Sequence, residues 1–309
     1  VGRQPCSPRR TAGRRLSDVP PRPPRKPPWL RVAIPGGPGH ARILGRRRQR
    51  GLATVCEEAR CPNRAECWEC GTATFMVMGA VCTRGCRFCS VGTAAQGQPL
   101  DPEEPQKLAD TVGEMGLDFA VITSVTRDDL PDGGAAHIVA CVEALRANNV
   151  LVEVLIPDLG GDPAALSVVV GSGPVVLGHN VEVVRRLSAA VRHPRADHDR
   201  SLRVLQVLRE TAGPRQLTKS AMLVGMGETD DEVTGTLAEL RQVGCQMIAI
   251  GQYLQPTARH LPVVEYRPPE WFDALAETAR AMGFAHVACG PLVRSSYRAS
   301  ELYVKGRVS

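Results

Sequence analysis

The chain of 309 residues is 43% hydrophobic and carries a formal net charge of +6. This apolar content suffices for a sizeable folded core, and no run approaches the eighteen or so apolar residues of a membrane helix. The five Phe, three Trp and four Tyr are too few for a base-stacking nucleic-acid platform.

The positive charge belongs to the N-terminal part of the chain. Residues 1–55 contain 14 Arg or Lys and one acid, Asp18, and carry +13, whereas residues 56–309 carry −7. Residues 1–25 are rich in Pro, Arg and Gly and lack apolar periodicity, so we expect a disordered basic tail rather than a targeting segment. The run at residues 46–50 is expected to be solvated, with contact to an acidic partner or to nucleic acid as the alternative.

A first group of three cysteines lies in an N-terminal extension, residues 26–71. Cys56, Cys61 and Cys67 are spaced C-x4-C-x5-C. Three thiolates bind three irons of a 4Fe-4S cluster and leave the fourth iron for another ligand. The residues alone leave this ligand open among Cys70, Cys141, Cys245, Cys289 and the serines of the segment RSSY at 294–297. Cys70 also forms a C-x2-C pair with Cys67, which would compete for the cluster or for zinc.

A second group of three cysteines follows the first predicted strand. Cys82, Cys86 and Cys89 are spaced C-x3-C-x2-C. Thiolates also bind zinc or copper(I), but zinc sites usually pair C-x2-C hooks or add histidines, and no histidine lies between residues 41 and 136. Disulfides suit short secreted chains, whereas this chain has eleven cysteines, an odd number, and no visible secretory signal. We therefore predict two 4Fe-4S clusters, with zinc as the alternative.

Residues 72–288 alternate between two patterns. Apolar, strand-like runs lie near residues 73–78, 119–123, 151–156, 175–178, 220–224 and 247–250. Helical stretches lie near residues 103–115, 135–147, 162–170, 200–211, 229–242 and 269–282. Strands that alternate with helices indicate parallel strands joined by right-handed crossovers. Six such units are too few for a closed eight-stranded barrel, so we predict an α/β fold, a partial (β/α)6 barrel, with a C-terminal extension at residues 289–309.

The loops that follow the predicted strands locate the chemistry. In β/α barrels the active site lies at the carboxyl ends of the strands. The cysteine loop of residues 82–89 follows the first strand, and polar or glycine-rich segments follow the others at 123–124, 157–158, 178–180, 225–228 and 251–257. We therefore expect all of them on one face. His179 and His260 have no visible nucleophile or metal partner and are expected to be structural, and Glu228 is expected to favour the start of a helix.

Several motifs resemble one enzyme family. The sequence CTRGCRFC at 82–89 is similar to the cluster signature of radical S-adenosylmethionine (SAM) enzymes. The segments CEEARCPN at 56–63, ECW at 66–68 and RSSY at 294–297 resemble the lipoyl synthase family more specifically. Further similar segments are GTATFM at 71–76, TSVTRDDLPDGGA at 123–135, GHNVE at 178–182, GQYLQPT at 251–257 and GPLVRSSY at 290–297. The resemblance covers about residues 26–305.

The resemblance implies a sulfurtransferase that makes lipoyl groups. Two sulfur atoms are inserted at C6 and C8 of a protein-bound octanoyl-lysine by means of two 5′-deoxyadenosyl radicals from SAM. Cys82, Cys86 and Cys89 are then the catalytic residues, because they bind the cluster that chelates and cleaves SAM. The auxiliary 4Fe-4S cluster on the first cysteine group is consumed as the sulfur source, and the resemblance points to Ser296 as its fourth ligand.

Two further residues are candidates for SAM binding. Phe88 is placed by its spacing near the adenine, with simple packing of the loop as an equal alternative. Asn180 is expected to hydrogen-bond polar groups of SAM, although an asparagine also caps turns.

The implied partners are proteins. They are octanoylated lipoyl-carrier domains (the acyltransferase subunit of 2-oxoacid dehydrogenases and the glycine-cleavage carrier protein), an electron donor such as ferredoxin or flavodoxin, and an iron–sulfur cluster carrier. Neither a membrane nor nucleic acid is expected. Oxygen-sensitive clusters and free thiols favour the cytoplasm, with an organellar matrix as the alternative if the basic N-terminus is a transit peptide. Two other functions stay open at this point: another radical SAM sulfur-inserting enzyme, and a zinc-stabilised module whose basic arm binds nucleic acid.

Overall fold

The computed structural model describes residues 25–32, 45, 50–69, 74–297 and 299. The predictions for the basic tail, for Cys70 and for residues 46–49 lie outside the described residues. No helix of the described part is both long and apolar enough to cross a membrane.

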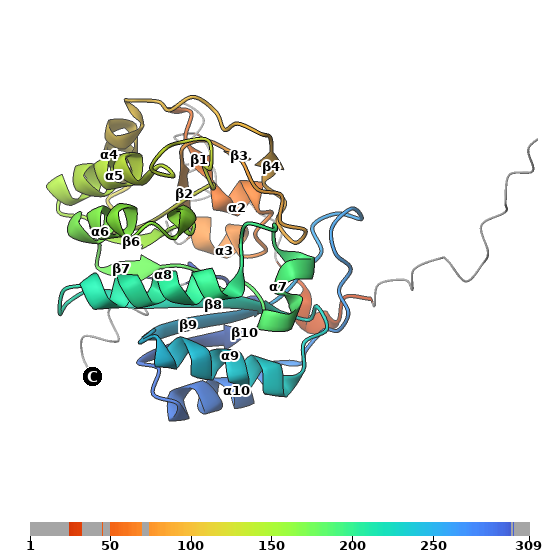
Figure 1. Ribbon diagram of the computed structural model, residues 1–309. Helices are drawn as coiled ribbons and strands as arrows, with labels where there is room; N and C mark the ends of the chain where they lie inside the picture. The colour runs from red at the N-terminus through yellow and green to blue at the C-terminus, as the bar shows by residue number, and fades with distance from the viewer. Residues whose placement is uncertain (1–24, 33–44, 46–49, 70–73, 298, 300–309) are drawn as a thin grey trace, which may run out of the picture.

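An eight-stranded sheet forms the centre of the fold (Figure 1). In spatial order its strands are β1 (Ala53–Thr54), β2 (Thr74–Val77), β5 (Phe119–Ser124), β6 (Leu151–Leu155), β7 (Val176–Gly178), β8 (Leu217–Val224), β9 (Met247–Gln252) and β10 (His286–Gly290). All neighbours from β2 to β10 are parallel, and β1 alone pairs antiparallel. A separate two-stranded sheet joins β3 (Val81–Cys82) and β4 (Gly92–Thr93).

Helices follow the parallel strands and lie along the outside of the sheet (Figure 1). The long ones are α4 (Glu104–Glu114), α5 (Ala135–Ala147), α6 (Pro163–Gly171), α8 (His198–Thr211), α9 (Asp230–Gln242) and α10 (Pro269–Ala281). The short ones are η2 (Pro28–Leu30), α2 (Val55–Glu58), α3 (Arg64–Glu69), η3 (Leu159–Gly161) and α7 (Arg185–Val191). Side-chain caps fix several starts: Asp162 and Asp197 accept backbone N–H groups, and Thr229 forms a capping box with Glu232.

The alternation of strand and helix confirms the predicted α/β architecture. Each of the six predicted strands and six predicted helices is present within a few residues of its expected bounds. The predicted count of six parallel strands is too low by one, because β10 extends the sheet beyond β9. β10 gave a weak signal because it has only five residues, of which every one is only partly buried. The sheet ends at β1 and β10, so it remains an open, partial barrel.

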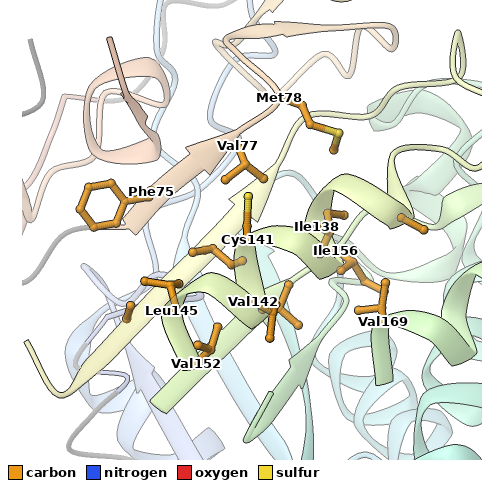
Figure 2. Close-up of a cluster of buried hydrophobic side chains, with 14 of the residues drawn as sticks. Phe75, Val77, Met78, Ile138, Cys141, Val142, Leu145, Val152, Ile156 and Val169 are labelled. Carbon is orange, nitrogen blue, oxygen red and sulfur yellow. The ribbon is translucent and has the colours of Figure 1, made fainter. Parts of the chain in front are cut away.

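Apolar clusters lie between the sheet and the helices. Figure 2 shows the part where α5 packs on the sheet, where Ile138, Val142 and Leu145 of the helix belong to one buried cluster with Phe75 and Val152 of the strands. All four residues of β2 are buried, as expected for a parallel strand that is covered on both faces.

A buried ion pair crosses the inside of the barrel. The Nζ atom of Lys219 on β8 lies 2.7 Å from Oε1 of Glu153 on β6, and the two side chains are 2% and 1% exposed. Side chains alternate along a strand, so Lys219 shares the inward face with Ala221 and Leu223, which line the cavity described below. Burial of two charges is tolerated because each supplies the other's counter-charge.

We predict that Lys219→Met destabilises the protein by about 3–5 kcal/mol, because it leaves the Glu153 carboxylate buried without a partner. The double variant Lys219→Met/Glu153→Leu should recover most of this loss, since an apolar pair of similar volume replaces the ion pair. Urea denaturation of the metal-free protein at neutral pH measures both. A double variant as unstable as the single one would contradict this account.

Candidate active site

A cavity of about 340 Å³ lies at the carboxyl ends of the barrel strands. Its wall contains five of the six motif cysteines, Cys56, Cys61, Cys82, Cys86 and Cys89. It also contains polar residues at or after strand ends (Thr123, Ser124, Asp158 and Asn180) and two serines of the C-terminal segment, Ser295 and Ser296. The predicted gathering of polar segments on one face is therefore confirmed for those at 123–124, 157–158 and 178–180 and for Gly251 at the start of 251–257. The segment at 225–228 follows its strand as expected but is not part of this wall.

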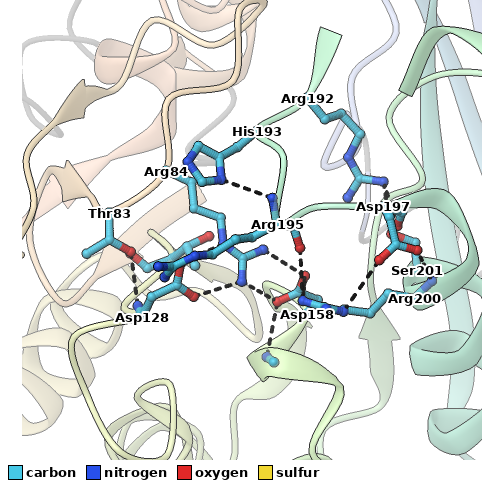
Figure 3. A network of polar contacts seen from close by, with 12 residues as sticks. Thr83, Arg84, Asp128, Asp158, Arg192, His193, Arg195, Asp197, Arg200 and Ser201 are labelled. Atoms are coloured by element: carbon cyan, nitrogen blue, oxygen red, sulfur yellow. Dashed lines mark hydrogen bonds and ion pairs between the residues drawn. The ribbon is translucent and has the colours of Figure 1, made fainter. Parts of the chain in front are cut away.

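The cysteine loop of residues 82–89 is held in place by one buried arginine. The guanidinium of Arg84 donates from Nε (2.8 Å) and Nη2 (2.7 Å) to Asp128 and from Nη1 (2.7 Å) and Nη2 (2.9 Å) to Asp158 (Figure 3). The side chains of Arg84 and Asp158 are 5% and 2% exposed. Burial by itself would lower the pKa of Arg84, but the hydrogen bonds to both carboxylates raise it, so the guanidinium stays charged.

Thr83 adds a second fastening to this loop. Its hydroxyl donates to the carbonyl of Thr126 (3.0 Å) and accepts the backbone N–H of Asp128 (2.9 Å). The loop is thus tied to the segments that follow β5 and β6, 44 and 74 residues further along the chain.

The second cysteine group has the surroundings of metal-bound thiolates. Backbone N–H groups of Arg84 and His193 donate to the sulfurs of Cys82 (3.4 Å) and Cys86 (3.3 Å). Burial raises the pKa of the Cys89 thiol to about 12 and also raises the pKa of Cys86. Thiolates in such a site need a cationic centre to offset their desolvation, and a coordinated metal deprotonates its thiols. Buried thiols with N–H donors therefore fit an iron–sulfur cluster.

The first cysteine group lies beside the C-terminal segment. Cys56 is buried in α2, and Cys61 lines the cavity. Cys67 lies in α3, partly buried against the core, and is not among the cavity residues. The side chain of Asn63 donates to the carbonyl of Leu292 (2.7 Å), which joins this region to the segment that ends in RSSY.

The two serines of RSSY point to the same cavity. The hydroxyl of Thr74 donates to Ser296 (2.8 Å), and the hydroxyl of Ser295 donates to Oδ1 of Asn180 (3.3 Å). Tyr297 donates its hydroxyl to the carboxylate of Glu66 on α3 (3.1 Å). Of the candidates for the fourth ligand that the structure describes, only these serines line the cavity, because Cys141, Cys245 and Cys289 lie elsewhere.

Gly251 allows the C-terminal segment to approach this closely. A Cβ atom at this position would lie 1.9 Å from the carbonyl oxygen of Val293, well inside any real contact. The backbone of β9 and the segment that follows β10 therefore meet where only glycine fits.

Two polar groups in the wall were given no individual role from the sequence, although Ser124 belongs to the predicted polar segment 123–124. Glu182 lines the cavity with a backbone φ of 67°, and burial raises the pKa of its carboxyl. The buried hydroxyl of Ser124, at the end of β5, has no hydrogen-bond partner within the described part of the chain. Both lie in motifs quoted above, GHNVE and TSVTRDD, and the position of each directly after a predicted strand was the available signal.

Phe88 and the expected structural residues have identifiable contacts. Phe88 lines the cavity and also packs against the apolar cluster of Met226 and Tyr253, so both of its predicted roles fit its position. His179 bridges the carbonyl of Ile156 and the hydroxyl of Ser201, each at 3.0 Å.

His260 and Glu228 also make contacts of a structural kind. His260 contacts the carbonyl of Cys89 (2.9 Å). Glu228 lies directly before Thr229, the N-cap of α9, at the helix start where it was expected, and its carboxylate accepts the N–H groups of Gly225 and Met226 in the preceding loop.

Comparison with known proteins gives two family matches. Residues 76–240 match the model of the radical SAM superfamily, and residues 14–61 match the N-terminal domain of lipoyl synthase. A lipoyl synthase of Anaeromyxobacter sp. (strain Fw109-5) is 51% identical over 286 residues, which are 92% of this chain and 97% of that protein. One of Picrophilus torridus is 50% identical over 276 residues (89% and 96%), and a mitochondrial lipoyl synthase of Branchiostoma floridae is 51% identical over 288 residues (91% and 76%).

Solved structures share the fold at low sequence identity. The crystal structure of methylornithine synthase has a TM-score of 0.51 and 14% identity, covering 70% of each chain. That of HydG, a maturase of the FeFe-hydrogenase, has a TM-score of 0.54 and 17% identity, covering 68% of this chain and 49% of the other.

We predict that His179 makes the protein less stable in mild acid. Burial lowers the pKa of its imidazole from 6.5 to about 4. Between these values the unfolded chain binds a proton that the folded protein does not, so stability falls as the pH falls through this window, by up to about 3 kcal/mol. Urea denaturation from pH 7 to pH 4 should show a flatter pH dependence for His179→Gln than for the unsubstituted protein. Equal slopes would show that His179 does not titrate in this way.

We also predict that Gly251→Ala destabilises the protein by about 1–3 kcal/mol, because the added methyl group forces β9 and Val293 apart. Gly235→Ala on α9 is the matched control. A Cβ there meets nothing within 4 Å, so helix propensity should stabilise that variant by up to about 1 kcal/mol. Thermal unfolding compares the two, and a neutral Gly251→Ala would contradict the close approach.

Proposed function

The chain belongs to the lipoyl synthase family of radical SAM enzymes, and we propose that its two cysteine groups hold two clusters with different tasks. The family inserts sulfur into a protein-bound octanoyl chain and uses SAM and 4Fe-4S clusters. Membership therefore decides between the enzyme and the zinc-stabilised module in favour of the enzyme. What we add is the assignment of roles to individual residues.

Cys82, Cys86 and Cys89 are assigned to the cluster that binds SAM. When bound, this cluster supplies the electron that splits SAM into methionine and a 5′-deoxyadenosyl radical. The backbone N–H groups that donate to the sulfurs of Cys82 and Cys86 support this assignment, because they orient the ligands. The hydrogen bonds of Arg84 to Asp128 and Asp158 support it as well, because they fix the position of the loop.

SAM itself requires polar groups around its amino acid and ribose. Asn180, Glu182 and Ser124 lie in the cavity wall, and the hydroxyl of Ser124 is buried without a partner. An unpartnered buried hydroxyl costs free energy unless a ligand satisfies it. We assign these three groups to SAM, and Phe88 to the wall beside the adenine.

Cys56, Cys61 and Cys67 are assigned to the cluster that donates sulfur, with Ser296 as the ligand of its fourth iron. The proximity of Ser296 to Thr74 and its place in the same cavity as Cys61 support this. A hard alkoxide is a poor match for iron in a sulfide cluster, which favours release of that iron as the cluster is consumed.

The remaining wall suits a saturated acyl chain. Val55, Met76, Leu155, Met222 and Val293 line the cavity. These side chains exclude water and offer an apolar surface to the octanoyl group, so that a radical formed there meets the substrate rather than solvent.

We propose octanoyl-lysine on lipoyl-carrier domains as the substrate, either of the 2-oxoacid dehydrogenase acyltransferase or of the glycine-cleavage carrier. The nine cysteines that the structure describes form no disulfide with one another, which favours a reducing compartment, and we propose the cytoplasm. We also propose the chain division into an N-terminal extension (26–71), a barrel (72–288) and a C-terminal extension (289–309) after a basic tail at 1–25. The contacts of Asn63 and Glu66 with residues 292 and 297 support a joint role for the two extensions.

One observation carries the proposal: Cys56 and Cys61 of the first group, all three cysteines of the second group and Ser296 line one cavity at the carboxyl ends of the strands. The decisive experiment is anaerobic reconstitution, followed by mass spectrometry of an octanoyl-lysine peptide incubated with SAM and dithionite. We expect about 8 iron atoms per chain, as two 4Fe-4S clusters require, and a product with two added sulfurs. Zinc in place of iron, or iron for one cluster only, would contradict the proposal.

We predict that Cys82→Ala and Cys61→Ala fail in different ways. Cys82→Ala should form no 5′-deoxyadenosine, because the cluster that cleaves SAM is lost. Cys61→Ala should still form 5′-deoxyadenosine but insert no sulfur, because only the donor cluster is lost. Each variant should retain roughly half of the iron.

Cys245→Ala is the control, since this buried cysteine lies away from the cavity, and it should keep both clusters and both activities. Normal sulfur insertion by Cys61→Ala would overturn the division of tasks.

A further inference from the structure

We propose that an acidic electron-carrier protein docks on a basic surface directly outside the cysteine loop of residues 82–89. We call this surface the arginine face and define it by Arg87, Arg195 and Arg259. The inference rests on the proposed function, because each SAM cleavage consumes one electron that the protein must receive from outside.

Hydrogen bonds bring the three parts of the arginine face together. The backbone N–H of Arg87 donates to the carbonyl of Val191 (2.9 Å), just before the loop that carries Arg195. The carbonyl of Arg87 accepts the N–H of Leu261 (3.2 Å), two residues beyond Arg259. Three segments distant in sequence are thus fixed side by side without any help from a ligand.

The arginine face is open to solvent. Arg87 and Arg259 are exposed, and the side chain of Arg195 is 66% exposed. Within the described part of the chain, the guanidinium of Arg87 donates only to the carbonyl of Ala190 (3.0 Å) and pairs with no carboxylate. That of Arg195 lies 3.3 Å from Asp128, which balances part of its charge.

Acidic residues do not cancel this charge. The segments 82–91, 191–197 and 253–264 contain one acid, Asp197, which is paired with Arg200 (3.6 Å). The neighbouring acids Glu57 and Glu58 on α2 reduce the positive potential at one margin. Arg60, which is exposed and donates to the carbonyl of Pro256 (3.3 Å), offsets part of this reduction. The charges of Arg87 and Arg259 remain, on a folded body whose sequence is otherwise acidic.

The position of Arg87 favours an electron carrier over the octanoylated substrate domain. Arg87 is exposed, whereas Cys86 and Cys89 on either side of it line the cavity. Solvent and the SAM-binding cysteines are therefore separated here by a single turn of chain. An electron donor needs only to come close, whereas an acyl-carrier domain must thread its long arm into the cavity. One electron leaves the donor per SAM cleaved, and no atom crosses the surface.

Redox partners commonly associate through small, charge-steered and transient contacts. Complementary charge raises the association rate and loses its effect when salt screens it. The arginine face has the features of such a contact: like charges, exposure to solvent and proximity to the proposed redox site.

The test uses the reconstituted enzyme and an acidic flavodoxin as the probe. Arg87→Glu/Arg259→Glu is compared with Arg215→Glu, an exposed arginine before β8 at the opposite end of the barrel. Surface plasmon resonance gives the Kd of flavodoxin, and 5′-deoxyadenosine is quantified with either reduced flavodoxin or dithionite. We expect the double variant to raise Kd and lower the flavodoxin-driven rate by about tenfold at low salt. With dithionite its rate should stay within about twofold of the unsubstituted enzyme, and the control should match that enzyme throughout.

Other outcomes overturn the inference. An equal loss with flavodoxin and dithionite would assign the arginines to the fold or the cluster. An unchanged Kd for flavodoxin with weaker binding of an octanoylated carrier protein would assign the face to the substrate domain. A flavodoxin Kd that does not rise in about 0.5 M salt would exclude charge steering. Failure of the unsubstituted enzyme to cleave SAM with dithionite would instead contradict the proposed function.

Discussion

The active site depends on one buried guanidinium between two carboxylates. Arg84 lies within the cysteine loop, Asp128 after β5 and Asp158 after β6, and the pairing spans three consecutive loops of the barrel. Buried ion pairs seldom add much net stability, because desolvation offsets their attraction, but they strongly disfavour any other arrangement once formed. The contacts of Arg84 therefore act on geometry, because they fix the position of the loop that carries the three sulfurs relative to the segments after β5 and β6.

Charge compensation continues around the rest of the cavity. Arg192 and Arg294 also line it, and Arg294 has no carboxylate partner in the described part of the chain. Burial lowers the pKa of Arg294, whereas the Cys61 thiolate opposes that shift. Two clusters with thiolate ligands would bring several negative charges into this space. The charge of Arg294 at the cavity wall fits that load.

The strands and helices could be predicted from the sequence more completely than the contacts of the candidate active site. Strand and helix alternation was readable because parallel strands are apolar along their whole length and their helices are amphipathic, both local properties. α7 and β10 were not predicted because α7 has only 7 residues and β10 is short and half-buried. The partners of Arg84 were not predicted for a different reason. Asp128 and Asp158 lie 44 and 74 positions after Arg84, and contacts over such distances leave no local sequence pattern. Asp128, within TRDDLPD, therefore resembled any acidic residue of a turn. The same holds for Gly251, whose need for glycine arises only when Val293 arrives.

Convergence of both cysteine groups on one cavity has a chemical consequence. A radical made beside one group has to act on a carbon that then reaches sulfur beside the other, and separate cavities would expose the intermediate to water and to side reactions. In this chain, residues 63–66 and residues 292–297 meet at the carboxyl ends of the barrel strands. Asn63 holds the backbone at Leu292, Glu66 holds Tyr297, and Thr74 on the first parallel strand holds Ser296. The donor site is therefore assembled from segments more than 220 residues apart, which ties its existence to completion of the barrel between them. A chain in which β9 and β10 had not joined the sheet would have no position for Ser296 beside Thr74. Under the proposed assignment of Ser296 as the fourth ligand, sulfur donation would therefore depend on a completed barrel.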